Sequence, residues 1–164
     1  MTGHAPIDHS DDHFHSAVPN ARAGSDWTVQ LVPAEHDDEP PYAYTVGLSV
    51  FRRHPELLTV GLSEQAARTV LNALGARVRS GERLAAGQII QDERAGRPWA
   101  ITPVPESASV ALLPLANVCH RPPGGPPVPA LQVVWSDADW RFPWDDGYRE
   151  PIHVQPVLAP PIVE

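Results

Sequence analysis

The chain contains no lysine, so all 12 of its basic residues are arginines, against 20 acidic residues and a net charge of −8. Phosphate contacts require a basic surface, so this balance argues against general nucleic-acid binding and against attachment to an anionic membrane. The single cysteine, Cys119, excludes an internal disulfide and is typical of a reducing compartment. We therefore expect a cytoplasmic protein that has neither nucleic acid nor membrane as a partner.

Long apolar runs and targeting signals are also missing. No apolar stretch approaches the ~20 residues that a membrane-spanning helix needs. The first residues are acids and histidines, where a signal peptide has a basic start followed by an apolar stretch. These two absences predict a soluble protein that stays in the cytoplasm.

The composition is that of one domain flanked by less regular segments. A length of 164 residues with 42% hydrophobic content allows a sizeable buried core. Residues 1–25 are rich in histidine and aspartate, lack an apolar period, and predict a disordered tail. Residues 26–164 are expected to form a single globular domain. Most of the 20 prolines lie after position 98, which predicts an extended proline-rich C-terminal segment.

Two apolar runs, Tyr42–Leu48 and Leu57–Leu62, both end in Val-Gly-Leu. Each run is apolar on both faces, which predicts two central strands. Ser63 and Glu64 follow the second run and are typical of a helix start. Apolar residues then recur at helical spacing as far as Val78, which predicts a helix with one face packed on the sheet.

Shorter patterns complete the predicted fold. Strands are expected at 26–32, 87–90, 99–104 and 130–135, with Pro103 favouring a sheet edge, and a short helix interrupted by Pro114 is expected near 109–118. The order of strands, helix and strands predicts an α+β fold with a mostly antiparallel sheet and one main helix packed on it. A split-barrel-like sheet is one form of this prediction. The predicted core comprises Val46, Leu48, Leu58, Val60, Leu71, Leu74, Val133 and Trp135.

Several of these blocks together resemble a known family. The segments Tyr44–Leu48, His54–Leu57 and Val60–Leu62 resemble the family called domain of unknown function 4262. The resemblance continues through Leu71-Asn72, Gly81–Arg83, Leu131–Trp135 and Arg141–Tyr148, and it covers about residues 27–155. It implies an uncharacterised bacterial protein with the fold of that family, and it implies no activity.

A compact cationic group, Arg52, Arg53 and His54, lies in the loop between the two central strands. Two arginines and a histidine can hold a phosphate or a carboxylate. Ser63 adds the free N–H groups of a helix N-terminus. If the two strands are antiparallel, however, this loop and Ser63 lie at opposite ends of the sheet. One anion then contacts both only if the loop folds back or a second subunit contributes, as in a homodimer.

Flavin-binding split barrels offer a loose fold analogy for this arrangement. In flavin reductases and pyridoxamine oxidases, strand ends and the next helix N-terminus hold the phosphate of the flavin. By this analogy alone, Thr45 and Ser49 join Arg52, Arg53 and Ser63 as candidate ligand residues, and flavin becomes a candidate cofactor.

The densest aromatic stretch includes Trp144 and Tyr148. Its rings are expected mainly in the core, but aromatic lids also line ligand pockets, so both residues are candidates for ligand binding. The histidines of the tail and the aspartates that follow residue 135 lack the fixed geometry or the spacing of a metal site, and we expect no metal.

No complete catalytic constellation is visible, so no catalytic residue is assigned and the patterns leave open whether the chain is an enzyme. Cys119 and His120 are adjacent, whereas a nucleophilic cysteine needs a base placed across space. Three functions remain: a small-molecule or anion-binding domain, an acidic protein–protein interaction module that uses the loop 35–39 and the proline-rich loop 121–129, and a flavin-binding oxidoreductase. The partner is accordingly an unknown small molecule or protein.

Overall fold

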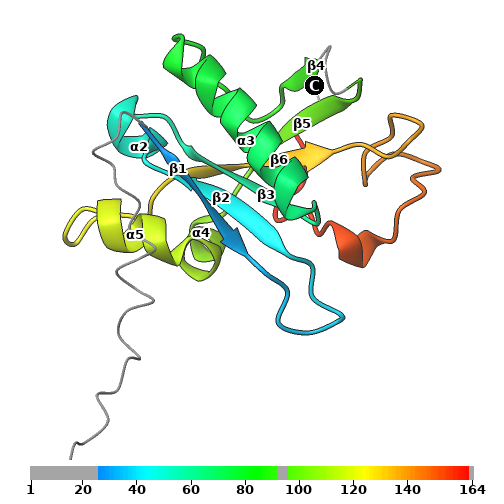
Figure 1. Ribbon diagram of the computed structural model, residues 1–164, viewed down its shortest axis with the longest axis horizontal. Coiled ribbons are helices and arrows are strands. Elements are labelled where there is room, and N and C mark those ends of the chain that lie inside the picture. The colour runs from blue at the N-terminus through cyan, green and yellow to red at the C-terminus, as the bar shows by residue number, and fades with distance from the viewer. Residues whose placement is uncertain (1–25, 92–95, 163–164) are drawn as a thin grey trace, which may run out of the picture.

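The computed structural model describes residues 26–91 and 96–162, which form an α+β fold around one six-stranded sheet (Figure 1). The strand order is β1-β2-β3-β6-β5-β4. The strands are β1 Thr28–Val32, β2 Tyr42–Val46, β3 Glu56–Val60, β4 Ile89–Gln91, β5 Pro98–Pro103 and β6 Ala130–Trp135. Every neighbouring pair is antiparallel except β3 and β6, which are parallel. The predicted fold class is confirmed, but the sheet is open, so its split-barrel-like form is not observed.

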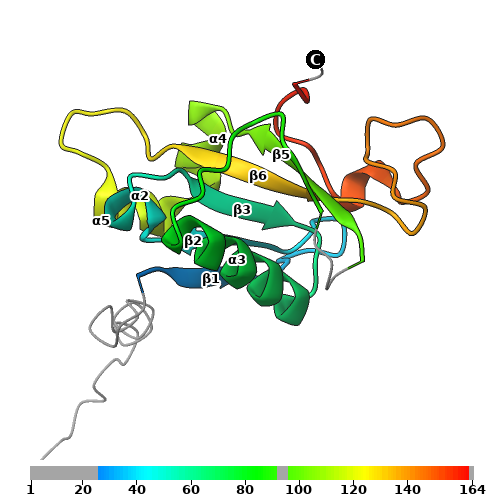
Figure 2. The same ribbon diagram turned by 90° about the horizontal axis from the view of Figure 1, so that it is seen from above.

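Helices cover both faces of the sheet (Figure 2). They are α2 Leu48–Phe51, α3 Glu64–Arg79, α4 Glu106–Leu112 and α5 Pro114–His120, followed by the short 3-10 helix η1 Ile152–Val154. Leu57 of β3 packs into the core under α3, whereas its neighbour Leu58 packs with Leu113 and Ala116 on the opposite face. The helix α3 is the main helix of the prediction, and the second face carries α4 and α5, in the region where a short helix was expected. The helices on the second face explain why the central strands are apolar on both sides.

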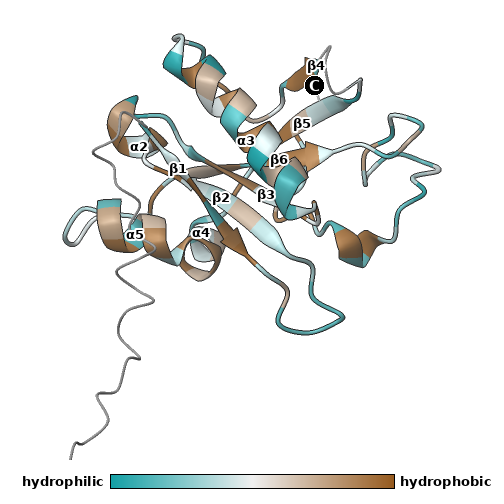
Figure 3. Ribbon diagram, in the orientation of Figure 1, coloured by the Kyte–Doolittle hydropathy of each residue, from teal (hydrophilic) through white to brown (hydrophobic). Residues whose placement is uncertain are grey.

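The start and the buried face of α3 follow the sequence pattern. Ser63 Oγ accepts a hydrogen bond from the N–H of Ala66 at 3.2 Å, so Ser63 is the N-cap. The buried face includes Ala67, Val70, Leu71, Leu74 and Val78, and Figure 3 shows hydrophobic and hydrophilic residues alternating along the helix. All the predicted core residues are buried except Trp135, which is partly exposed.

Two prolines divide the second half of the chain. Pro114 stands at the first turn of α5, where its missing N–H costs no helical hydrogen bond, and it separates α4 from α5. Pro103 lies in β5, which is not the edge strand that the sequence predicts, since β4 lies outside it. The short β4 pairs only with residues 98–100, so the outer side of Pro103 has no strand partner to lose.

The segment after η1 returns along the end of β6 through two buried glutamine side chains. Gln155 accepts from the N–H of Trp135 at 2.8 Å and donates to its carbonyl at 2.9 Å. Gln132 donates to the carbonyl of Pro156 and accepts from the N–H of Leu158. The Gln155 amide takes the place of a neighbouring strand beyond Gln132, the last residue of β6 that pairs with β3. The backbone of Trp135 is therefore held rigidly.

The predicted tail, residues 1–25, lies outside the described residues, and the division into tail and domain stays a prediction. Within the described ranges, every helix is too short or too polar to span a membrane.

Candidate functional site

The amino end of β3 is organised by Glu56, whose side chain is fully buried. Its carboxylate accepts hydrogen bonds from Thr45 Oγ1 (2.6 Å), Gly47 N (2.8 Å), Leu48 N (3.3 Å), Ser49 N (3.1 Å) and Ser49 Oγ (2.9 Å). The carboxylate thus satisfies the otherwise unpaired N–H groups at the start of α2. Gly47 has a φ of +128°, and a Cβ there would lie 2.6 Å from the carbonyl oxygen of Asp26. This end of the sheet is therefore held by a buried hydrogen-bond network centred on Glu56.

Thr45 and Ser49, predicted as ligand residues, belong to this Glu56 hydrogen-bond network. Thr45 is fully buried and also accepts from the N–H of Leu57 at 2.9 Å. Both hydroxyl hydrogens are donated to Glu56. Neither hydroxyl therefore has a hydrogen left to donate to a ligand.

The two arginines of the predicted anion site have separate surroundings. Arg52 donates to the carbonyl of Arg79 at the end of α3 at 2.7 Å, and its guanidinium lies 4.7 Å from the ring centre of Phe51. Arg53 is exposed and has a φ of +51°. It lines a cleft of about 280 Å³ with His54, His120 and the proline-rich loop. The structure brings Ser49, Arg53 and His54 to one cleft but directs Arg52 towards α3.

His54 is buried, with 1% of its surface exposed, and both ring nitrogens have partners. Nε2 lies 2.9 Å from the N–H of Leu84 and therefore accepts, which assigns the ring hydrogen to Nδ1 and a donated bond to the carbonyl of Pro55 at 2.7 Å. Burial lowers the pKa of His54, and the charge of Arg83 lowers it further. His54 is thus a neutral structural bridge between the α2–β3 loop and the segment after α3.

This burial predicts a loss of stability in mild acid. Because the pKa of His54 is lower in the folded than in the unfolded chain, the unfolded chain binds more protons just below the ordinary histidine pKa of about 6.5. The free energy of unfolding should be constant above that pH and fall as the pH decreases towards the lowered folded-state pKa. Urea unfolding of the wild type and of His54→Gln, measured between pH 7.5 and 5, checks this.

The non-titrating variant should lose this part of the pH dependence, whereas His153→Gln, at an exposed position, should keep it. An identical slope in the wild type and in His54→Gln would contradict the assignment.

Ser63 lies far from these groups. β2 and β3 are antiparallel, so the loop that precedes β3 and the residue that follows it lie at opposite ends of the sheet. From the rise of a strand, Glu56 and Ser63 are roughly 20 Å apart. The Arg52 loop and Ser63 therefore lie at opposite ends of the sheet, as expected for antiparallel strands. One small anion cannot contact both Arg52 and Ser63 of one chain.

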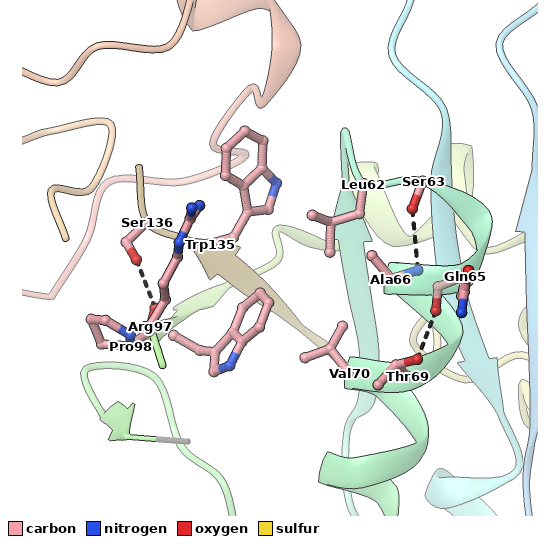
Figure 4. Close-up of a pocket in the computed structure, with 11 residues that line it drawn as sticks. Leu62, Ser63, Gln65, Ala66, Thr69, Val70, Arg97, Pro98, Trp135 and Ser136 are labelled. Carbon is pink, nitrogen blue, oxygen red and sulfur yellow. Dashed lines mark hydrogen bonds between the residues drawn. The ribbon is translucent and has the colours of Figure 1, made fainter. Parts of the chain in front are cut away.

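Ser63 instead belongs to a cleft between the first turns of α3 and the ends of β5 and β6, which we name the α3–β6 cleft (Figure 4). Its volume is about 560 Å³, about twice that of each of three other clefts. The lining residues are Leu62, Ser63, Gln65, Ala66, Thr69, Val70, Arg97, Pro98, Trp99, Trp135 and Ser136. Figure 4 shows the residues of the α3 side facing Arg97, Pro98, Trp135 and Ser136 across an open space.

Local hydrogen bonds hold both walls in place. Thr69 donates to the carbonyl of Gln65 at 2.8 Å, and Ser136 donates to the carbonyl of Pro98 at 3.1 Å. Trp135 Nε1 donates to the carbonyl of Val60 at 2.8 Å, which fixes the indole ring. Trp99 and Trp135 are register partners in the β5–β6 pair, so the two indoles stand on the same face of the sheet.

The sequence did not single out this cleft, because its residues come from three distant segments. Trp135 was expected in the core, and Ser63 alone was among the candidate site residues. A signal was present in the pattern Gly-Leu-Ser after β3, where a strand passes directly into a helix N-terminus.

Trp144 and Tyr148 lie in the loop that follows β6, and neither is among the residues that line the α3–β6 cleft. Trp144 stacks on Phe142 with ring centres 5.1 Å apart, and it lines a separate cleft of about 230 Å³. The hydroxyl of Tyr148 accepts from Gln155 at 3.4 Å, and burial raises the pKa of Tyr148.

The same loop is held by the buried side chain of Asp137. Its carboxylate accepts from the N–H groups of Asp139, Arg141 and Arg149. Burial alone would raise the pKa of Asp137, but these three donors lower it. The loop presents Trp140, which has a φ of +64° and is 56% exposed. An exposed tryptophan in a restrained turn is a feature that the sequence did not reveal.

One group of possible metal ligands occurs among the described residues. Glu35, His36 and Glu39 place ligand atoms within 4.8 Å of one another in the loop between β1 and β2. All three side chains are exposed, and a firm metal site needs ligands whose side chains are held in place by further contacts. The absence of a metal site therefore stays a prediction from the sequence.

These features define a class of protein: an α+β domain with an open mixed sheet, helices on both faces and a cleft at the carboxyl ends of its one parallel strand pair. The family model described as domain of unknown function (DUF4262) matches residues 23–149. The chain therefore belongs to that family, as its sequence blocks predict. No curated protein and no solved structure matches the chain.

Proposed function

We propose that the protein binds a small organic molecule in the α3–β6 cleft. The observation that carries this proposal is the position of a cleft of about 560 Å³ beside Ser63 and Trp135, at the carboxyl ends of the parallel strands β3 and β6. Ligand pockets commonly measure about 300–1,000 Å³. In open α/β sheets they lie outside the carboxyl ends of parallel strands, by fold-level analogy.

The walls have the chemistry of a binding site. Leu62, Val70 and the two indoles supply apolar surface, and Ser63 and Gln65 supply a few polar groups at one side. General acid–base catalysis needs a positioned proton donor and acceptor such as histidine or a carboxylate. The described lining residues contain neither, so they support binding, and we assign no reaction to the cleft.

The five tryptophans provide a direct test. In protein carrying ¹⁵N-labelled tryptophan, titration with naphthalene-2-carboxamide should shift the indole signals of Trp99 and Trp135. The signals of Trp27, Trp140 and Trp144, which lie outside the cleft, serve as internal references.

Two phenylalanine variants sharpen this test. Ala66→Phe fills the cleft and should abolish the shifts, whereas Ala76→Phe, at an exposed position of the same helix, should leave them unchanged. Shifts confined to the reference tryptophans, or equal in both variants, would refute the proposal.

The acidic interaction module is a second candidate. It is supported by Trp140 and Ile152, which are 56% and 75% exposed, and by the exposed acidic loop 35–39. Buried aromatic anchors dominate protein interfaces, so an exposed tryptophan in a restrained turn suits such a role. Light scattering after size exclusion tests the homodimer form of this candidate, since a dimer that buries Trp140 should dissociate in Trp140→Ala.

The flavin-binding alternative keeps little support. It depended on a likeness to split barrels, and the sheet is open. It also placed the phosphate between Arg52 and Ser63, which lie at opposite ends of β3. A purified protein with a flavin absorbance spectrum would restore it.

A further inference from the structure

We infer that the ligand of the α3–β6 cleft is a planar organic anion, a flat ring system that carries a carboxylate or phosphate group. This inference rests on the proposed function and adds the chemical class of the ligand. Two observations carry it: the charge of the lining and the arrangement of the two indoles.

The lining is positive on an otherwise acidic chain. The net charge of the chain is −8. Among the eleven described residues of the cleft, Arg97 is charged and none is acidic. The nearest acid on α3, Glu64, lines a neighbouring cleft that shares Leu62 and Ser63 with this one. An arginine prefers the flat, two-oxygen geometry of carboxylate and phosphate groups.

The start of α3 adds little positive potential of its own, because the carboxylate of Glu64 in its first turn offsets the helix dipole. This helix has 16 residues, and the positive end of its dipole lies at Ser63, on the opposite wall from Arg97. Of its first N–H groups, that of Ala66 is bonded by the Ser63 hydroxyl. The dipole favours an anion but does not by itself place one, so the proposal depends on Arg97.

The indole rings of Trp99 and Trp135 favour a ligand with a flat ring system. Trp99 and Trp135 lie opposite each other in neighbouring strands, which brings their rings to one side of the cleft. Leu62 and Val70 form the facing wall (Figure 4). The bond from Trp135 Nε1 to Val60 and the backbone bonds to Gln155 hold one ring before any ligand arrives. Such a preorganised apolar slot loses little entropy when it takes up a rigid ring.

Two probes of nearly equal shape separate the charge from the ring. Naphthalene-2-carboxylate and the neutral naphthalene-2-carboxamide are titrated at low ionic strength, with the Trp99 and Trp135 signals as the readout. The carboxylate should bind about fivefold more tightly, a modest factor because Arg97 is exposed. Added salt should reduce that ratio.

Two arginine variants then locate the charge. Arg97→Gln should reduce the ratio to about one while the carboxamide affinity stays the same. Arg68→Gln, at an exposed position of α3 outside the lining, should keep it. Equal binding of the two probes by the wild type would overturn the anion but leave the proposed function standing. An unchanged ratio in Arg97→Gln would overturn the role of Arg97, and no shift with either probe would overturn both proposals.

Discussion

Replacing Glu56 with glutamine should lower the free energy of unfolding by about 3 kcal/mol or more, since each buried polar group left without a partner costs about 1–3 kcal/mol. The glutamine has the same size, so no cavity forms. Its amide nitrogen, however, must replace one oxygen in front of donors from Gly47, Ser49 and Thr45. At least one oxygen site then becomes a donor that faces other donors.

Guanidinium unfolding measures this loss, and Glu150→Gln, at an exposed position, is the matched control with an expected change below about 0.5 kcal/mol. Amide hydrogen exchange provides a local readout, because the N–H groups of Gly47 and Ser49 should exchange faster in the variant. A midpoint equal to that of the control would show that the carboxylate does not hold α2.

Truncating Leu71 to alanine should cost about 2–5 kcal/mol, the usual loss for a fully buried leucine, because both transfer energy and packing are lost. Leu71 has no exposed surface and lies at the centre of the α3 face, between Ala67 and Leu74. A thermal or urea melt measures the change. Val118→Ala, at a position that is 80% exposed on α5, serves as the control. A midpoint that does not move in Leu71→Ala would mean that another face of α3 packs on the sheet.

Local patterns in the sequence were sufficient for the elements themselves. The run 130–135 was predicted as a strand and is β6 with the same bounds. Ser63 was predicted as the cap of α3 and caps it. The two-sided apolar character of residues 57–62 correctly indicated a central strand, because such a strand must be covered on both faces. Each of these inferences depends on side-chain spacing and on the chemistry of neighbouring residues.

Long-range pairing was beyond the same reasoning. Nothing in the segment 56–60 indicates that it lies beside β6 in a parallel pair, since the hydrogen-bonding groups of a backbone are the same in every strand. The role of Glu56 was missed for a related reason. A glutamate between a proline and a leucine suggests a local ion pair, and only the approach of the α2 loop converts it into a buried acceptor.

The sequence by itself determined the family, the fold class and the apolar faces that form the core, because composition and periodicity are properties of short stretches of chain. The tertiary structure alone decided where the cleft that we propose as a ligand site lies. It separated Arg52 from Ser63 by the length of a strand, and it brought Ser63 to Arg97, Trp99 and Trp135. It also decided small details such as Gly75 in the middle of α3, where a Cβ would lie 2.5 Å from the ring of Trp27. A site assembled from three strand ends depends on which strands are neighbours, and that order is set by the packing of the whole core.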